Sequence, residues 1–469
     1  MSFKQYIVLF ALLLAVPPVA RAQSAQTTAV PYDTLYTAPV APLSLEECIA
    51  RAVYFDTPTV SRSLDTLQAH IALQSAWHSF LPFVGASVSQ DFNFGRSQDK
   101  RGVMLDQSSA NTSFGASASI DLFTGLKRIA ELKAARLDKS RSIATLEQST
   151  EEVTIRVIGL YYNLVLQTEV LQTNKLSIEQ TRRTLEYTKH MVDAGKWAVS
   201  KLYEVEARLA SDELALANAK GSLLLAQQAL AQAIAYNAPT PIEVEKPSTD
   251  ALIEEERMKI RPMDEVYREA LANRPSYRAT LLNTEIARLM VQSAQSGWYP
   301  SLSLRGGYSN GYYLPLDKEM RQLTPSFSDQ MKQNGRYFVG LSLSIPLFDG
   351  LRTYDNVRRA RLRTQYAEVE RAAEARRLQQ SVSEAHTNAT TALLGIDAAN
   401  KSVEAARKSY ETMRIAFEAG QRTAVDLEQS QNKLHVAEVE ALRAKYDFLY
   451  KTAILETMTR QPAPSSNNR

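Results

Sequence analysis

The sequence predicts a mainly α-helical protein built from two structural repeats, each combining a β-hairpin with long coiled-coil helices. Three observations lead to this fold class. Sequence landmarks recur at constant offsets, each copy holds two segments of alternating apolar and polar residues, and long stretches space apolar residues by threes and fours. Alternation is typical of strands, and the three-and-four spacing is typical of coiled coils. The strands are long enough to contribute to a transmembrane β-barrel portion.

The chain of 469 residues begins with a segment typical of a secretory signal. Lys4 supplies the positive start, Tyr6 to Ala15 form an apolar run, and Ala20-Arg21-Ala22 is a small-x-small cleavage site. The run is too short to span a membrane and is followed by Pro17-Pro18. We therefore expect residues 1–22 to be a signal peptide and 23–42 an extended leader.

Composition excludes several function classes. The formal net charge is only +3, so no nucleic-acid partner is expected. The single cysteine, Cys48, cannot form a disulfide within the chain and reads as a small buried apolar side chain. The five histidines do not show metal-ligand spacing. We expect no catalytic residue, no metal site and no cofactor. A secreted hydrolase is the second alternative, and it would need a nucleophile or a carboxylate constellation that the sequence does not show.

An internal duplication organises the chain. The run Leu45 to Ala52 matches the run Met263 to Ala270, 218 positions later. The run Ser119 to Leu126, which contains Leu-Phe-x-Gly, matches Ser344 to Leu351 at an offset of 225. Ala194-Gly195-Lys196 matches Ala419-Gly420-Gln421 at the same offset of 225. Ordered landmarks at constant offsets predict two equivalent structural units.

Each unit contains two predicted strands. In the first unit they cover about 83–94 and 112–122, and in the second about 301–313 and 337–347. One face of each strand is apolar and the other is rich in Ser and Gly. The connections between the paired strands are long and polar, as expected for outside loops of a membrane barrel. The alternative is a soluble sheet with its apolar face on a core.

Long helices follow the strands. We expect them over about 125–193 and 350–418, each with a return helix, over about 199–236 and 423–459. In the second unit the apolar or small seam runs without a break through Leu378, Val382, Ala385, Ala389, Ala392, Ile396, Ala399, Val403, Ala406, Tyr410, Met413 and Phe417. Many seam positions are Ala, which bury little area, so these helices need neighbours.

The expected domain order follows from these elements. Residues 43–236 form the first repeat and 263–460 the second. They are joined by an equatorial linker over 237–262 that carries three prolines and an acidic run. Residues 461–469 form a polar tail that we expect to be disordered.

Four strands in one chain cannot close a barrel, and an open sheet edge is not tolerated in lipid. The chain is therefore expected to assemble with copies of itself. A trimer with twelve strands is the smallest assembly with a plausible passage. Its Ser and Gly face would line water, and its Val, Leu and Ile face would meet lipid.

The duplicated order of Pro-strand, Leu-Phe-x-Gly helix entry and Ala-Gly helical turn resembles the TolC-like outer membrane efflux protein family, from about Leu43 to Thr459. The resemblance implies a homotrimer with a 12-stranded β-barrel in the outer membrane and a long periplasmic α-helical barrel. It also implies an exit duct that passes substrates from an inner-membrane transporter and a periplasmic adaptor to the outside. The alternative is a periplasmic coiled-coil adaptor, or a structural protein without a pore.

The second helical turn is similar to the family's gate segment, which carries an arginine followed by two acidic positions three apart. Arg422 matches the arginine, and Asp426 matches the first acidic position. Gln429 stands at the second, and Lys201 occupies the position of a first-turn acidic residue in the family member best known for its gate. With Phe417 at the start of this turn, these residues form the predicted pore gate.

Both turns also have a purely structural interpretation. Thr423 and Asp426 have the spacing of a capping box that opens the return helix, so Asp426 could cap, gate, or do both. Gly195 and Gly420 suit the left-handed conformation at a helix end. The resemblance adds that these two turns dock the adaptor.

Overall fold

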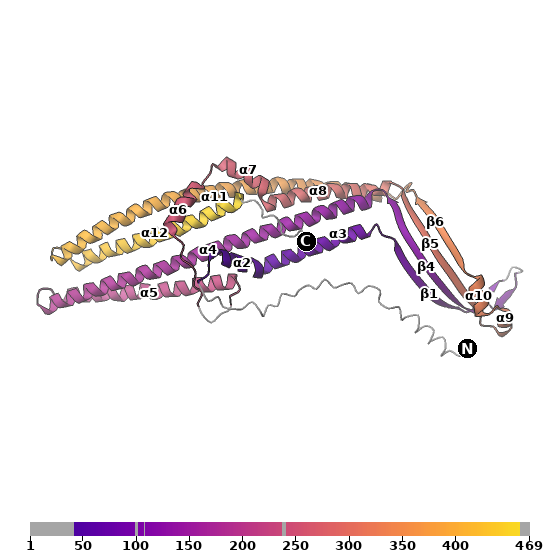
Figure 1. Ribbon diagram of the computed structural model, residues 1–469, viewed down its shortest axis with the longest axis horizontal. Coiled ribbons are helices and arrows are strands. Elements are labelled where there is room, and N and C mark those ends of the chain that lie inside the picture. Colours follow the sequence, from indigo (N-terminus) through magenta and orange to yellow (C-terminus); the bar gives the residue numbers. More distant parts are fainter. Residues whose placement is uncertain (1–41, 99–101, 107, 237–240, 460–469) are drawn as a thin grey trace.

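The computed structural model describes residues 42–98, 102–106, 108–236 and 241–459. The predicted signal peptide, nearly all of the leader, the first residues of the linker and the predicted tail lie outside these described residues. Figure 1 shows an elongated molecule with a β-sheet at one end and paired helices extending away from it.

The main sheet joins the two repeats. It consists of β1 (Phe83–Asn93), β4 (Ser109–Thr124), β5 (Ser301–Pro315) and β6 (Arg336–Ser344), all antiparallel and in the order β1-β4-β5-β6. The central pairing of β4 with β5 therefore connects the second strand of one repeat to the first strand of the other (Figure 1).

The strand ends differ from the predicted ones. β4 extends beyond 112–122 at both ends, and β6 stops at Ser344, before Pro346. Proline has no N–H to donate to a strand ladder, which accounts for that early end. The segments predicted as outside loops contain structure of their own, listed in chain order as β2 (Arg96–Gln98), β3 (Met104–Asp106), α9 (Lys318–Leu323) and α10 (Phe327–Gln333).

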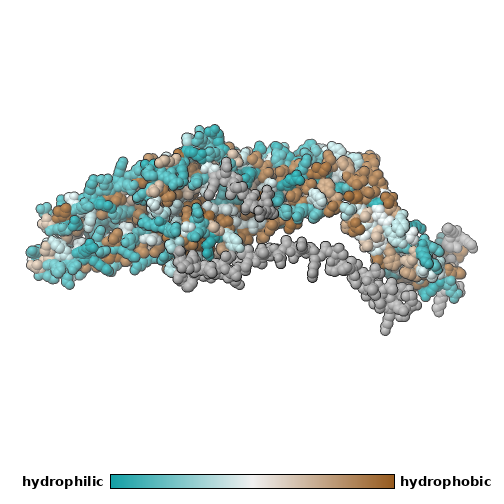
Figure 2. Space-filling model, viewed as in Figure 1, coloured by the Kyte–Doolittle hydropathy of each residue, from teal (hydrophilic) through white to brown (hydrophobic). Residues whose placement is uncertain are grey.

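The strand register places apolar side chains on one face of the sheet. Ile120, Leu304 and Leu341 form one row across three strands. The neighbouring row on the opposite face holds Ser119 and Arg305. The apolar face is exposed in the described chain, and Leu341 on it is 64% exposed. Figure 2 shows hydrophobic patches over the sheet region.

Helix α10 closes the end of β5 that extends past β6. The ladder between β5 and β6 ends at Ser309 and Arg336. Beyond it, the Gln330 side-chain amide donates to the Tyr313 carbonyl at 2.9 Å and accepts from the Tyr313 N–H at 2.8 Å. Gln330 thus occupies backbone groups that a neighbouring strand would otherwise pair with.

Each half of the helical region has shorter helices before its hairpin and long ones after it (Figure 1). In the first half these are α2 (Leu45–Phe55) and α3 (Thr57–His78), then α4 (Lys127–Asp193) and α5 (Val199–Ala233). Asp56 is the single residue between α2 and α3. Its carboxylate accepts a hydrogen bond from the Thr59 N–H at 3.0 Å and caps α3.

The second half repeats this order after one extra helix. The elements are α6 (Thr249–Met258), α7 (Met263–Asn273), α8 (Pro275–Gln295), the 3-10 turn η1 (Ser296–Trp298), α11 (Arg352–Glu418) and α12 (Ala424–Thr459). Helix α6 lies within the segment predicted as the equatorial linker, 237–262. Within the described ranges, no helix combines the length and apolarity needed to cross a membrane.

A left-handed corner turns each hairpin into its long helix. Gly125 and Leu126 have φ of 63° and 68°, and Gly350 and Leu351 have φ of 68° and 65°. A left-handed leucine is strained by about 1–2 kcal/mol, so its occurrence at both corners marks a shared structural requirement. This corner is the structural basis of the Leu-Phe-x-Gly signal.

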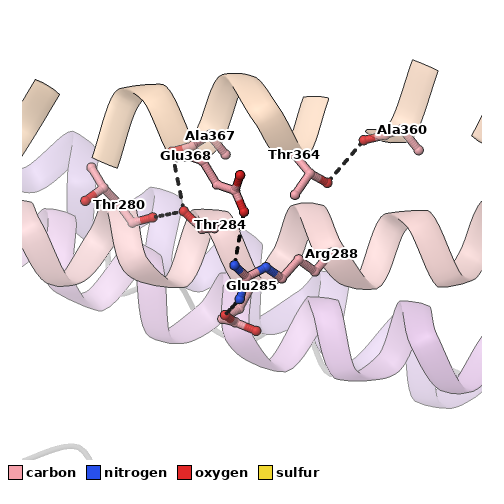
Figure 3. Close-up of polar contacts among 8 residues, drawn as sticks. All are labelled: Thr280, Thr284, Glu285, Arg288, Ala360, Thr364, Ala367 and Glu368. Atoms are coloured by element: carbon pink, nitrogen blue, oxygen red, sulfur yellow. Dashed lines mark hydrogen bonds and ion pairs between the residues drawn. The ribbon is translucent and has the colours of Figure 1, made fainter. Parts of the chain in front are cut away.

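Helix α8 is tied to α11 by polar contacts (Figure 3). The Thr284 hydroxyl is buried and lies 3.0 Å from the Thr280 carbonyl and 3.4 Å from the Ala367 carbonyl. Arg288 bridges Glu285 on its own helix and Glu368 on α11, at 2.7 and 3.1 Å.

Helix α8 also contacts α4, across the boundary between the repeats. Four side-chain pairs mark this joint: Arg274 with Glu151, Arg278 with Glu147, Arg141 with Asn283, and Ser293 with Glu131. Two of them are ion pairs, and Arg274 lies 2.9 Å from Glu151.

The largest apolar core lies midway along the helices. It brings together α2, α4, α5 and α12, with Leu164, Leu230 and Phe448 almost fully buried. Cys48 belongs to this core and is fully buried, and burial raises the pKa of its thiol to about 11. The cysteine therefore packs as the small apolar side chain that the sequence predicts.

Candidate gate at the helical tips

The two helical turns have the same backbone. Gly195 and Gly420 have φ of 71° and 73°. In the first turn Gly195 and Lys196 donate to carbonyls of the last turn of α4, at 2.8 and 2.9 Å. The second turn repeats both bonds, at 2.9 Å each, and together they form a Schellman motif. The glycines therefore serve the structural role assigned to them, and both tips have open surface around them.

An aromatic cluster joins the two tips. The Trp197 ring lies 4.9 Å from the Phe417 ring and 5.5 Å from the Tyr187 ring, measured between centroids. The Lys201 ammonium lies 4.6 Å from the Trp197 centroid, within cation–π range. Phe417 is only 2% exposed. Of the predicted gate residues, Phe417 and Lys201 therefore contact this cluster, which holds one hairpin tip against the other.

Asp426 caps α12. Its carboxylate accepts from the Thr423 hydroxyl at 2.8 Å and from the Thr423 N–H at 3.1 Å, and the Asp426 N–H donates back to the Thr423 hydroxyl. These bonds lower the pKa of Asp426, and the nearby Arg422 charge lowers it further. Arg422 and Gln429 are exposed. The structure thus contains the capping box and places three of the predicted gate residues at the surface of the second tip.

A buried polar network lies next to the aromatic cluster, on its side toward the sheet. Arg208 and Asp212 on α5 are 3.0 Å apart, and the Thr181 hydroxyl donates to Asp212 at 2.7 Å. The network reaches α12, because the Gln431 amide donates to the Thr181 hydroxyl at 3.2 Å and Arg208 lies 3.5 Å from Glu428. It therefore links the first hairpin to the second through charged and polar groups.

Sequence reasoning missed this network. Its signal was present, since Val205, Asp212, Ala219 and Ala226 recur every seven residues and are all buried. A charged carboxylate buried at a seam position is strongly destabilising unless a partner compensates for its lost hydration. Arg208, one helical turn before Asp212, is the nearest basic residue that could pair with it.

Ion pairs and inclined aromatic rings hold the helices of the two tips together. Across the described residues, no group of three or more His, Cys, Asp or Glu side chains has the arrangement of a metal site.

Comparison with known proteins defines the class. The family model for outer membrane efflux proteins matches residues 61–235 and 266–459. One matched segment lies within each repeat, and together they cover most of the chain. The protein belongs to the outer membrane efflux protein family.

Individual relatives agree with this assignment. The chain is 24% identical to the outer membrane protein TolC of Escherichia coli over 410 residues, which cover 84% of this chain and 78% of that protein. The fold matches the crystal structure of CusC with a TM-score of 0.75 at 16% identity, covering 91% of this chain and 96% of that one. It matches the outer membrane protein VceC of Vibrio cholerae with a TM-score of 0.72 at 15% identity, covering 89% and 97% of the two chains.

The protein is therefore an outer-membrane exit duct of the kind that serves efflux or secretion systems, with helices that extend into the periplasm. This class consists of transport channels and not of enzymes. The prediction of fold class and function is confirmed, and the alternatives of a poreless adaptor and a secreted hydrolase are set aside.

Proposed function

We propose that three copies of this chain form one duct and that the helical tips close its periplasmic end. The observation that carries the proposal is the order of the sheet. Among the described strands, β1 and β6 each have a ladder partner on one side only. A closed ring of such sheets leaves no open edge in lipid, and three copies give twelve strands with room for a passage.

We further propose that the duct receives its cargo from an inner-membrane transporter through a periplasmic adaptor, and that the turns at Gly195 and Gly420 dock the adaptor. Both turns lie at the end of the molecule farthest from the sheet (Figure 1). Their matching backbone offers an adaptor two similar binding sites per chain. Co-purification of an adaptor with the intact protein, and its loss when both turns are changed, would test this arrangement.

The closed state is held, in this proposal, by the link between the hairpins. A substitution that removes the Gln431 contact between α12 and the polar network should loosen the tips without removing the Arg208–Asp212 pair. Gln431→Ala deletes the amide that reaches Thr181, so single-channel conductance in planar bilayers should rise several-fold. Asn432→Ala, at the adjacent exposed position, is the matched control. Equal conductance for both variants would contradict the role of this network in closure.

The gate role of Asp426 needs its own test, because the same carboxylate caps α12. Three copies of Asp426 around the axis would form a negative ring that favours cations. Asp426→Asn keeps the shape and removes the charge, so it should lower cation selectivity while conductance stays measurable. Thr423→Ala weakens the cap and keeps the charge. If both variants lose selectivity equally, the residue acts through the cap alone.

A further inference from the structure

The segment between β5 and β6 is fixed to the end of β5 by side chains that bond to its backbone. Gln330 on α10 is only 6% exposed, and besides its two bonds to Tyr313 its amide donates to the Pro325 carbonyl at 2.9 Å. The Asn334 amide donates to the Gly311 carbonyl at 2.7 Å. Because these bonds use backbone groups beyond the end of β6, α10 has a defined position against the sheet.

Two side-chain contacts place α10 on the apolar side of the sheet. Alternate residues along a strand share a face, so Asn310 and Tyr312 lie on the same face as Leu304. The Phe327 ring of α10 lies 5.1 Å from the Tyr312 ring, measured between centroids. The Asn310 amide donates to the Met331 carbonyl of α10 at 2.7 Å. Helix α10 therefore packs on the face that the Ser- and Gly-rich side chains do not share.

The composition of the apolar face changes along the strands. Toward the helices it carries aliphatic side chains such as Leu304 and Leu341. Toward α10 it carries aromatic ones, namely Phe92, Phe114, Tyr308, Tyr312 and Tyr337. Aromatic girdles form where the wall of a membrane barrel passes from hydrocarbon to headgroups. Since α9 and α10 lie at the end of the sheet farthest from the long helices (Figure 1), this girdle marks the outer leaflet.

Helices α9 and α10 add exposed apolar side chains to this girdle. Met320, Leu323 and Phe327 are all exposed, and Leu323 is 82% exposed. Phe327 connects them to the sheet, because its ring contacts Tyr312 on one side and remains exposed on the other. Contiguous exposed apolar side chains mark surfaces that contact a partner or a membrane.

We propose that α9 and α10 lie against the outer flank of the strand wall and contact outer-leaflet lipid at the boundary between acyl chains and headgroups. In this position they leave the mouth of the duct uncovered. Lipid is the partner that fits, because the exposed side chains continue the lipid-facing side of the sheet. The inference rests on the trimeric duct proposed above, since only a closed ring of strands separates a lipid side from a water side.

A fluorescent label on one introduced cysteine can test the position of this segment. Leu323→Cys carries a bimane label on the exposed side chain of α9. Ser309→Cys carries the same label on the polar face of β5, opposite Arg336. The native Cys48 is fully buried. Labelling in detergent before reconstitution ensures that both variants carry the label when they are studied in bilayers.

In vesicles of phospholipid with brominated acyl chains, the label of the Leu323→Cys variant should be quenched at least about twofold more strongly than that of the Ser309→Cys variant. Iodide in the water should quench the two labels in the reverse order. In planar bilayers, the label of Ser309→Cys should lower single-channel conductance, and the label of Leu323→Cys should leave it unchanged.

Two results would overturn the lipid contact while leaving the duct intact. One is equal quenching of both labels by the brominated lipid in protein that forms channels. The other is a Leu323→Cys label that iodide reaches and that lowers conductance, which would place the segment across the mouth. Wild-type and labelled protein without any channel activity would overturn the duct itself.

The role of Gln330 in positioning this segment has a separate test. Gln330→Ala removes the three bonds of its amide, so the segment should leave the wall and lipid quenching of the Leu323→Cys label should fall by about half. Gln333→Ala changes an exposed residue of the same helix and is the matched control. Equal quenching in the two backgrounds would show that Gln330 does not hold the segment against lipid.

Discussion

Asp426 illustrates how one side chain can satisfy two interpretations of a sequence motif. Its carboxylate completes a capping box with Thr423, and it also stands at the surface of the tip. Because the pKa of Asp426 is lowered in the folded protein, the charged cap is fully formed above about pH 4. Its contribution is lost as the pH falls through the lowered value, so acid should fray the start of α12.

Asp212 contributes more to stability than Asp426, because it is buried and lies 3.0 Å from Arg208. Asp212→Ala leaves that guanidinium without its nearest carboxylate and should lower the free energy of unfolding by about 3 kcal/mol. Denaturant unfolding of the solubilised protein measures the change.

Glu213→Ala is the matched control for this substitution. Glu213 pairs with Arg182 at 3.5 Å across an exposed surface, so its removal should cost less than about 1 kcal/mol. Equal losses for the two variants would show that the buried network does not stabilise the tips.

Strand β6 was predicted from the alternation of apolar and polar residues alone. Its residues alternate between an apolar face and a Ser- and Gly-rich face, and both are exposed in the single chain. Alternation predicted the strand and its two faces correctly. It did not predict the end of the strand at Ser344, which depends on the pairing lost before Pro346.

Adjacent positions on β6 test which face meets lipid. Leu341→Arg places a charge on the apolar face and should cost about 2–4 kcal/mol at the bilayer midplane, so less protein should reach the outer membrane in an assembled form. Ser342→Arg places the same charge on the polar face and should be inserted normally with altered ion selectivity. Membrane fractionation followed by bilayer recording distinguishes the two. Normal insertion of the Leu341 variant alone would reverse the assignment of faces.

The long helices were predictable because their seams are long and regular, and α4 and α11 begin within two residues of the predicted starts. Helices α9 and α10 were not, because they depend on tertiary contacts such as the Gln330 amide on β5. The same holds for the polar network, since Thr181 and Gln431 come together only after two hairpins have packed. Local patterns therefore predicted the elements, and contacts distant in sequence decided the site.

The covalent link between the two repeats has a consequence for mass action. For a ring of six separate half-chains, the ratio of closed rings to free half-chains would rise with the fifth power of the free half-chain concentration. For three tandem chains, the ratio of rings to free chains rises only with the second power. Each chain also holds one joint together at a high effective concentration before it meets a partner. Ring closure can thus proceed at the low copy numbers typical of a dilute compartment, and half-formed rings have fewer ways to dissociate.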